Sequence, residues 1–402
     1  MNPKDTIASK PRINSIDVLR GFALMGILLL HCLEHFESYY LPKLESPFWQ
    51  WIDTAIHDTL FFLFQGKSYA IFSLLFGLSF FMQLDSQAGK DKYYQLRYIW
   101  RLIVLFVFGY VNGLFYMGEW FIIYAMSGIL LFPLHKVPSK VLIMISILFF
   151  LQIPQLVDFI NILVHNTPPA PSAISQQMSR LFREGYDIYA NGSLWNVLTF
   201  NAVQGRIALM LWFINVRYQQ MIGLFIIGIL IGRSRIYKDP DKMVYWSKKI
   251  LPYAIGWFLL FYIIVWTLPF FGLERQTLRA GTGLLKTFGN LGMMMTYICG
   301  FTVLYYQTVR GYKMLDKLAA VGRMSVTNYM MQSIIGITIF YGFGLGLANQ
   351  TFLVCFMIGL LLCTFQIWYS NWHFKRFYYG PMEWLWRTLT WFKKIPMKRL
   401  II

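Results

Sequence analysis

Charged side chains are scarce in this chain of 402 residues. They make up 13% of it, and only 18 residues are Asp or Glu, whereas hydrophobic residues make up 57%. A soluble domain carries roughly 25% charged residues. The shortage argues against an ordinary soluble domain and favours an all-α polytopic membrane protein, a single integral membrane domain spanning residues 1–402.

Motifs for cofactors, metals and covalent catalysis are also missing. The four cysteines lie in or beside apolar segments without CxxC spacing, so no disulfide framework or zinc site is expected. There is no phosphate loop, no dinucleotide-binding fingerprint, no metal-ligand cluster and no serine nucleophile elbow. We therefore expect no metal, and none of the common nucleotide-dependent enzyme classes.

Positive charge is abundant, with a net charge of +18. The Lys and Arg residues occur as short clusters between apolar runs, so no basic face of a soluble domain is available to a nucleic acid. We interpret the positive charge as a signal of membrane topology, with the lipid bilayer as the main partner.

Ten segments are long and apolar enough to be candidate membrane spans. The second is long, and we expect Gly66 to kink it while residues 48–60 lie along the membrane surface. The sixth is interrupted by Arg206 and Arg217. The candidates are 16–33, 60–84, 98–116, 119–134, 140–160, 207–232, 250–271, 284–306, 325–345 and 350–371.

The distribution of Lys and Arg predicts the orientation. If the N-terminus is cytoplasmic, the inward-facing segments contain 27 of these residues and the outward-facing segments only five. We therefore expect both termini in the cytoplasm and a first span that is retained, not cleaved.

Two segments outside the spans are distinctive. Residues 161–205 form a long external loop between an N-terminal region, 16–160, and a C-terminal region, 206–390. We expect irregular chain and then an interfacial helix there, serving as a lid or binding surface. The tail 372–402 mixes tryptophans with basic residues, as cytoplasmic interfacial amphipathic helices do.

Three polar residues share one face of the first span, "IDVLRGFALMGILLLHCLEHF". Asp17, Arg20 and His31 fall on one helical stripe, and Asp17 can pair with Arg20 at i, i+3. An arginine at mid-membrane costs about 2.5–3.5 kcal/mol on insertion scales. One interpretation places Arg20 and His31 at the two membrane interfaces. The other makes the stripe functional, with His31 suited to acid–base chemistry.

Further polar residues lie at or near membrane depth. Asp53 and Glu119 are either solvated carboxylates at the outer surface or members of the same cavity. Lys67 lies too deep to be solvated, so it needs a carboxylate, a carbonyl or an anionic ligand. The run "GRMSVTNYMMQS" is either interhelical hydrogen-bonding surface or part of a site.

Several motifs together resemble a known family. They are "SIDVLRGFALMGILLLH", "GKSYAIFSLLFGLSF", "RLIVLFVFGYVNGLFYMGEWFIIYAMSGILL", "GRMSVTNYMMQS" and "GPMEWLWRTLT". Their order resembles the YeiB-like family of bacterial multispan proteins, whose C-terminal half defines domain of unknown function 418. That family in turn resembles the transmembrane acyltransferase superfamily, including the acyltransferase-3 O-acetylases and the heparan-glucosaminide N-acetyltransferase.

The resemblance implies a chemistry. In the acyltransferase-3 branch an arginine and a histidine, separated by ten residues, lie on the first helix, and Arg20 and His31 have that spacing. YeiB-like chains often carry Asn at the position of His31, and their Gly-Asp-Ile-Leu is Gly118-Glu119-Trp120-Phe121 here. The resemblance implies a bacterial inner-membrane enzyme using acetyl-CoA or another acyl-CoA.

The implied roles cover nine residues. His31 is the expected base, oriented by Glu119 or Asp53, with Lys67 or a backbone amide holding the oxyanion. The cytoplasmic acyl-CoA would be held by basic residues, and the acceptor would be a hydroxyl or amine of a small molecule or glycan. The cofactor-binding candidates are Arg20 with its partner Asp17, Arg97, Arg101 and Arg323.

Two other functions remain open from the sequence. A transporter or permease would use the same buried charges as a solute or proton path, although no internal repeat supports it. A non-catalytic membrane protein with a vestigial site is the third reading. The acceptor, the acyl group and the oligomeric state, a homodimer included, are left open.

Overall fold

The computed structural model describes residues 13–38, 44–87, 93–165 and 173–399. Within these ranges the regular structure is helical, apart from an isolated bridge between Phe377 and Lys398. The α-helices are α1 (Asn14–Leu33), α2 (Pro47–Phe64), α3 (Ser68–Gln87), α4 (Tyr94–Phe115), α5 (Phe121–Leu134), α6 (Ser139–Phe150), α7 (Ile153–His165), α8 (Ala173–Asn191), α9 (Leu194–Ala202), α10 (Gln204–Trp212), α11 (Tyr218–Ser234), α12 (Pro240–Thr267), α13 (Arg275–Gln307), α14 (Val309–Arg323), α15 (Ser325–Phe340), α16 (Phe352–Arg376) and α17 (Pro381–Trp391).

The all-α membrane fold is confirmed. In the described residues, eight helical segments are long and apolar enough to cross a membrane. Each overlaps one of the predicted spans. They are Asn14–Leu33, Pro47–Ser86, Gln95–Phe115, Ser139–Val164, Gln204–Ser234, Pro240–Phe271, Arg275–Gln307 and Phe352–Arg376.

The two other predicted spans correspond to shorter helices. α5 has 14 residues and α15 has 16. At a rise of 1.5 Å per residue they are about 21–24 Å long, less than the roughly 30 Å of a bilayer core. Both carry many buried residues, so they are interior helices packed among longer ones. The predicted total of ten spans therefore stays a prediction.

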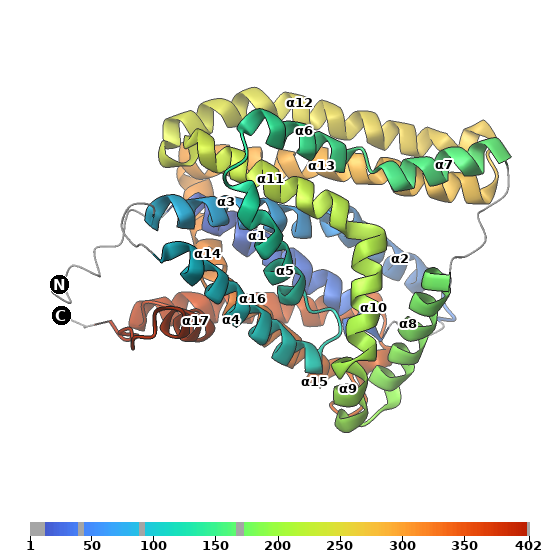
Figure 1. The fold of residues 1–402 in the computed structure, drawn as a ribbon. Coiled ribbons are helices and arrows are strands. Elements are labelled where there is room, and N and C mark those ends of the chain that lie inside the picture. Colours follow the sequence, from blue (N-terminus) through green and yellow to red (C-terminus); the bar gives the residue numbers. More distant parts are fainter. Residues whose placement is uncertain (1–12, 39–43, 88–92, 166–172, 400–402) are drawn as a thin grey trace.

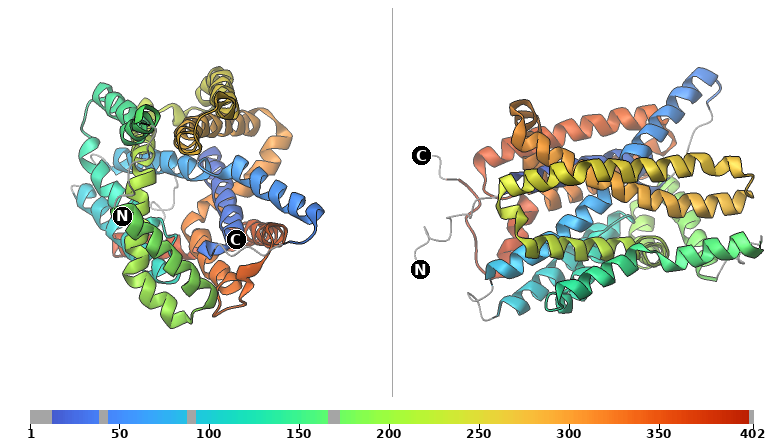
Figure 2. Two further views of the ribbon diagram at one scale, coloured as in Figure 1. Left: turned by 90° about the vertical axis from the view of Figure 1, so that its right-hand side faces the viewer. Right: turned by 90° about the horizontal axis from the view of Figure 1, so that it is seen from above.

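The helices are arranged around a buried central helix. Figure 1 shows α6, α7, α12 and α13 along one side of the molecule and α15, α16 and α17 on the opposite side. The end-on and top views of Figure 2 show the same long pairing of α12 with α13. The beginning of α1 and the helix α17 lie at the same end of the bundle.

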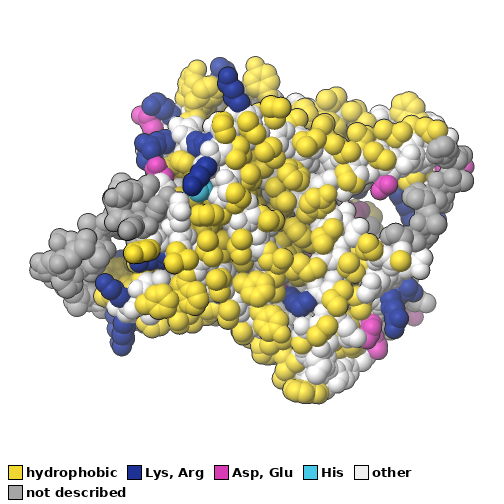
Figure 3. Space-filling view, in the orientation of Figure 1, with side chains coloured by type: hydrophobic (Ala, Val, Ile, Leu, Met, Phe, Trp, Pro, Cys, Tyr) yellow, Lys and Arg dark blue, Asp and Glu magenta, His cyan; other side chains and the backbone are white. Residues whose placement is uncertain are grey.

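Burial separates the central helix from the helices that face lipid. In α1, 72% of the most apolar 18-residue stretch is buried, compared with 6% of the corresponding stretch of Pro240–Phe271, the segment that includes α12. Figure 3 shows hydrophobic side chains covering the middle of the molecule, while Lys and Arg gather mainly toward its two ends. Such a belt is expected of a surface in contact with lipid chains. The polar stripe of α1 therefore faces protein, not lipid.

The predicted span 60–84 is two helices instead of one kinked helix. α2 ends at Phe64 and α3 begins at Ser68, with Gly66 between them at φ +81°. This left-handed conformation is accessible to glycine at little cost, and it breaks the helix completely. Residues 48–60, predicted to lie on the membrane surface, form most of α2.

The predicted span 207–232 is also interrupted. A π-helical segment, Phe213–Arg217, joins α10 to α11, and Figure 1 shows α10 turned sharply away from α11. π-Helical segments inside helices are rare and often occur at functional sites. This interruption places the side chain of Arg217 at the junction, where it can reach the interior.

α1 and α14 pack through glycines that permit very close approach. A Cβ atom added to Gly322 would lie 1.9 Å from the carbonyl oxygen of Asp17, and one added to Gly21 would lie 2.2 Å from that of Leu318. Such contacts are characteristic of small residues at helix interfaces in membranes. These contacts fix the position of α14 along the axis of α1, beside its polar stripe.

We predict that Gly322→Ala destabilises the protein by about 1–3 kcal/mol, because the new methyl group meets backbone that cannot yield. Thermal unfolding in detergent measures this. Gly300→Ala in α13 is the matched control, since a Cβ there meets nothing within 4 Å. Equal melting temperatures for the two variants would contradict the close packing of α1 on α14.

Candidate functional site

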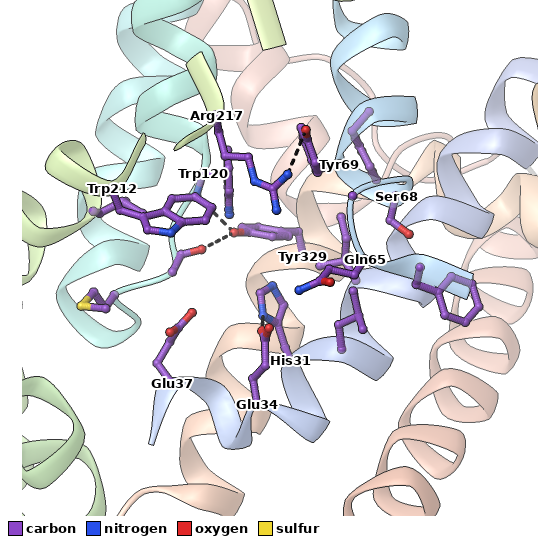
Figure 4. A pocket seen from close by; sticks show the side chains of 18 of the residues that line it. His31, Glu34, Glu37, Gln65, Ser68, Tyr69, Trp120, Trp212, Arg217 and Tyr329 are labelled. Atoms are coloured by element: carbon purple, nitrogen blue, oxygen red, sulfur yellow. Dashed lines mark hydrogen bonds and ion pairs between the residues drawn. The ribbon is translucent and has the colours of Figure 1, made fainter. Parts of the chain in front are cut away.

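A cavity of about 540 Å³ opens beside α1 (Figure 4). Its walls come from α1, the start of α3, the turn between α4 and α5, α8, and the junction of α10 with α11. The side chains used below are His31, Glu34, Glu37, Gln65, Ser68, Tyr69, Trp120, Arg183, Tyr186, Trp212, Arg217, Ser325 and Tyr329.

His31 contributes its imidazole to this cavity. Its Nδ1 lies 2.8 Å from the hydroxyl oxygen of Tyr116 and 3.6 Å from a carboxylate oxygen of Glu34. The side chains of His31 and Glu34 are 12% and 19% exposed. An imidazole with a phenol and a carboxylate at one nitrogen is oriented and electrostatically supported, as an acid–base group requires.

A third acidic group, Glu37, is brought to the same place by an unusual turn. His35, Phe36 and Glu37 all have positive φ, between 51° and 76°. Left-handed conformations of non-glycine residues are costly and cluster at functional sites. The turn folds the chain back, so that ligand atoms of His31, Glu34 and Glu37 lie within 4.8 Å of one another. One nitrogen and two carboxylate oxygens could hold a divalent cation, which the sequence did not predict.

Packing offsets the strain of this turn. Phe36 is buried against Gly336, where a Cβ atom would lie 2.1 Å from its ring. The ring nitrogen Nε2 of His35 is 2.8 Å from the carbonyl oxygen of Gln350. Burial lowers the pKa of His35, which favours its neutral form. His35 is therefore a structural anchor of the turn.

The turn that carries Tyr116 is held by one arginine. Nη2 of Arg206 donates to the carbonyl oxygens of Gly113, Tyr116 and Met117 at 2.8, 3.1 and 3.0 Å. Gly113 lies in the last turn of α4, where carbonyls lack partners within the helix, and Tyr116 and Met117 follow it. The Met117 carbonyl also accepts from the Glu119 N–H at 2.8 Å. Arg206, which interrupts the apolar pattern of the sequence, therefore fixes the Tyr116 backbone from α10.

Glu119 lies in the same turn but faces the protein interior. It accepts hydrogen bonds from the side-chain amide of Asn112 and, at 2.6 Å, from the backbone N–H of Phe121. The Asn112 amide also donates to Ser333 Oγ at 3.1 Å. Burial raises the pKa of Glu119 to about 7, against the opposing effect of these hydrogen bonds.

The predicted catalytic partners of His31 are elsewhere. Glu119 belongs to the Asn112 cluster, and Asp53 accepts a hydrogen bond from the backbone N–H of Leu353 at 2.9 Å, at the start of α16. Lys67 donates to the carbonyl oxygen of Phe62 at 2.6 Å, which meets its predicted need for a carbonyl. Tyr116 and Glu34 thus occupy the positions expected of Glu119 and Asp53.

The predicted acyl-CoA contacts do not line the cavity. The ion pair of Arg20 with Asp17 is confirmed at 2.8 Å, and Arg20 also donates to Ser79. The other three arginines lie over aromatic rings of α16 and α17. They are Arg97 over Trp391 at 4.3 Å, Arg101 over Trp386 at 3.9 Å and Arg323 over Phe374 at 4.2 Å.

The long segment 161–205 does contribute to the cavity. Its described part contains the end of α7, all of α8 and α9 and the start of α10, and α8 supplies Arg183 and Tyr186 to the wall. The predicted irregular start at 166–172 lies outside the described residues. Tail residues 381–391 form α17, which packs on α4 through a hydrogen bond from Trp386 Nε1 to the Arg101 carbonyl at 2.9 Å.

Several cavity residues were missed in the sequence. Glu34 follows His31 by one helical turn on the same stripe, so the spacing could have revealed it. Tyr116 carries no such signal, because it becomes a partner of His31 only through the turn that Arg206 holds. Arg217 was noted only as an interruption of a span.

We predict that Glu119→Gln changes how stability depends on pH. Glu119 ionises near pH 4.5 when unfolded and near 7 when folded, so the folded state retains its proton longer. This contribution is fully present below pH 4.5 and is lost as the pH rises through about 7. The wild type should therefore lose roughly 2–3 kcal/mol relative to Glu119→Gln between pH 4.5 and 8.

Thermal unfolding of both proteins across that range measures the effect. Asn112 can adapt to the neutral group, since its amide oxygen has no hydrogen-bond partner in the described structure. A difference between the two proteins that is independent of pH would contradict a buried carboxyl group that is neutral near pH 7.

Comparison with known proteins agrees with the resemblance to the YeiB-like family. Residues 231–393 match the family described as "Protein of unknown function (DUF418)". "Uncharacterized protein YxaH" of Bacillus subtilis (strain 168) is 29% identical over 96% of each chain. "Uncharacterized protein YeiB" of Escherichia coli (strain K12) is 27% identical over 94% of this chain and 95% of its own. No solved structure matches. The chain is therefore similar to the DUF418 family over residues 231–393 and, over nearly all of its length, to the bacterial proteins YeiB and YxaH.

Proposed function

We propose that this protein is a membrane-embedded acyltransferase that moves an acyl group, in the simplest case acetyl, from cytoplasmic acyl-CoA to a hydroxyl or amine acceptor. The observation that carries the proposal is the environment of His31. Its imidazole lines a cavity of about 540 Å³ and contacts Tyr116, with Glu34 close to the same nitrogen. The Arg20–His31 spacing of the acyltransferase-3 branch supports it.

In the proposed reaction His31 removes the acceptor proton. With the Nδ1 proton donated toward Tyr116 or Glu34, the lone pair of Nε2 is left to accept it. The acceptor oxygen or nitrogen bonds to the thioester carbon, the carbon–sulfur bond breaks, and the imidazolium returns its proton to the departing thiolate. The Glu34 carboxylate stabilises the imidazolium between these steps.

Tyr116 keeps its proton throughout this sequence. Burial raises the pKa of its phenol well above the usual value, so it orients the imidazole as a neutral hydroxyl. Gly118 protects this arrangement, since a Cβ atom there would lie 2.4 Å from the Tyr116 hydroxyl oxygen. Tyr116 is a positioning residue, while His31 is the base.

The oxyanion of the intermediate requires a donor other than Lys67, whose amine is bonded to Phe62. α3 begins at the cavity wall, where Ser68 and Tyr69 line it. The N-terminus of a helix carries unpaired N–H groups and a partial positive charge, which suits a developing oxyanion. We assign this task to the first turn of α3.

The two substrates would arrive from opposite sides of a bacterial inner membrane. The acceptor enters beside α8, whose residues form part of the cavity wall. The acyl-CoA enters from the cytoplasm, past the basic clusters that the sequence places there. Ser325, at the start of α15, is also part of the cavity wall.

A permease is the second candidate, favoured by the break between α2 and α3. Secondary transporters use helices interrupted near the midplane, with the N-terminus of the second half directed at a substrate. Here the interruption between α2 and α3 borders the same cavity through Gln65 and Gly66. Turnover of a thioester without net solute movement separates the two candidates.

We predict that the purified protein in detergent binds acetyl-CoA saturably and hydrolyses it slowly, because water can replace a missing acceptor. His31→Ala should reduce hydrolysis by about 10²–10⁴-fold, the usual contribution of a general base. Tyr116→Phe should reduce it roughly tenfold, the value of one lost hydrogen bond. Scintillation counting of released acetate measures both.

His57→Ala is the control, since His57 lies on α2, pairs with Asp58 and is absent from the cavity wall. It should leave hydrolysis unchanged. If folded protein fails to bind acetyl-CoA or a longer acyl-CoA at millimolar concentration, the proposal is wrong and uptake of solute into vesicles becomes the experiment to perform.

A further inference from the structure

Arg217 is one of two arginines that line the cavity, on the wall formed by the π-helical junction. Its guanidinium lies over the ring of Tyr69 at 4.7 Å and 5.6 Å from that of Trp212. Nη1 of Arg217 donates to the Tyr69 hydroxyl at 3.2 Å, and that hydroxyl donates in turn to Gln220. These contacts fix the guanidinium plane without neutralising its charge.

Arg217 has hydrogen-bonding capacity to spare. Among the described residues no carboxylate forms an ion pair with it, and its buried Nε has no hydrogen-bond partner. A buried donor on a charged group costs free energy when it is left unsatisfied. At membrane depth such a cation normally pairs with an acid or marks a substrate path.

The surroundings of Arg217 add positive charge instead of removing it. Lys67 lies within electrostatic range of both Arg217 and Lys286. In the described structure the amine of Lys67 donates to the neutral carbonyl of Phe62 and lies 5.6 Å from the centre of that residue's ring. This side of the cavity therefore has a positive potential that a ligand must compensate.

The opposite end of the cavity carries acidic side chains. Figure 4 shows Arg217 across the cavity from the His31 imidazole, with the side-chain amide of Gln65 close to the imidazole. Glu34 and Glu37 lie beyond His31. A molecule bound here thus meets a cation at one end, a base in the middle and carboxylates at the other end.

We infer that the cavity binds an acceptor carrying an oxyanion, a carboxylate or a phosphate, which Arg217 holds while a hydroxyl or amine of the same molecule faces His31. The guanidinium fork matches both oxyanions and makes strong, charge-assisted hydrogen bonds to them. The role of this ligand as an acyl acceptor rests on the proposed acyl transfer. The anion-binding site is inferred from Arg217 and its surroundings, independently of that reaction.

The rings beside Arg217 indicate what connects the two ends. Trp120, Trp212 and Tyr69 line the wall between Arg217 and the turn that carries Tyr116. Aromatic walls with a few placed polar groups are typical of sites for small organic ligands. A hexose ring fits a cavity of about 540 Å³ and can carry both an anion and a hydroxyl.

The test compares three hexoses of similar size that differ in one group: glucose, glucuronate and glucose 6-phosphate. Calorimetry on the purified full chain, without any acyl donor, should show the two anions binding at least tenfold more tightly than glucose. Arg217→Gln should abolish that preference, and Arg217→Lys should retain part of it, because charge survives without the fork. The two anionic sugars distinguish carboxylate from phosphate.

Arg233→Gln is the matched control. Arg233 lies on α11, the helix that follows Arg217, but it donates to Ser139 and the His135 carbonyl, away from the cavity wall. The anion preference should be unchanged in it. Equal binding of the three sugars, no binding of any, or a preference that survives Arg217→Gln would each overturn the inference.

A measurement on the wild type covers the case in which Arg217→Gln does not fold. Modification of Arg217 by phenylglyoxal, read by mass spectrometry of its peptide, should be slowed by glucuronate or glucose 6-phosphate and not by glucose. Equal modification with all three sugars would overturn the inference. Anion preference without acetyl-CoA turnover would refute the acyltransferase and keep this site, whereas turnover without anion preference would do the reverse.

Discussion

The site depends on the hydrogen bonds that Arg206 makes to the end of α4. One guanidinium nitrogen accounts for the carbonyls of Gly113, Tyr116 and Met117, which the helix itself leaves unpaired. In a membrane, water cannot readily replace such a partner, so this charge is retained in an otherwise apolar helix. The consequence reaches the chemistry, because the same turn presents the Tyr116 hydroxyl to His31.

The cavity is organised by the separation of charge along it. Glu34 and Glu37 surround His31 at one end, while Arg217 lies at the other without a carboxylate partner in the described residues. The charged side chains at one end form no ion pair with those at the other end in the described structure. Strained or interrupted backbone borders both ends, with positive φ at His35–Glu37 and a π-helical segment at 213–217. Irregular backbone at this depth is tolerated where it lines a cavity, which agrees with a ligand that bridges the two charges.

Features that depend on local sequence pattern could be predicted from the sequence, whereas features that depend on contacts between distant segments could not. Apolar runs located the spans, and i, i+3 spacing located the Asp17–Arg20 pair, since both depend on neighbours within one helix. The contact of His31 with Tyr116 depends on a turn 85 residues away in sequence, which no periodicity encodes. Glu119 was assigned to His31 because of its proximity to the outer surface, but its carboxylate turns toward Asn112. α5 and α15 have the composition of spans, and only their packing shows them to be short interior helices.

The most direct test of this account is the tautomer of His31. Nitrogen NMR of protein with ¹⁵N-labelled histidine, assigned by comparison with His31→Ala, reports which ring nitrogen carries the proton. The account predicts a proton on Nδ1, held between Tyr116 and Glu34, and a changed signal in Tyr116→Phe. A proton on Nε2, or a signal that is unchanged when the Tyr116 hydroxyl is removed, would contradict the role proposed for the turn that Arg206 holds.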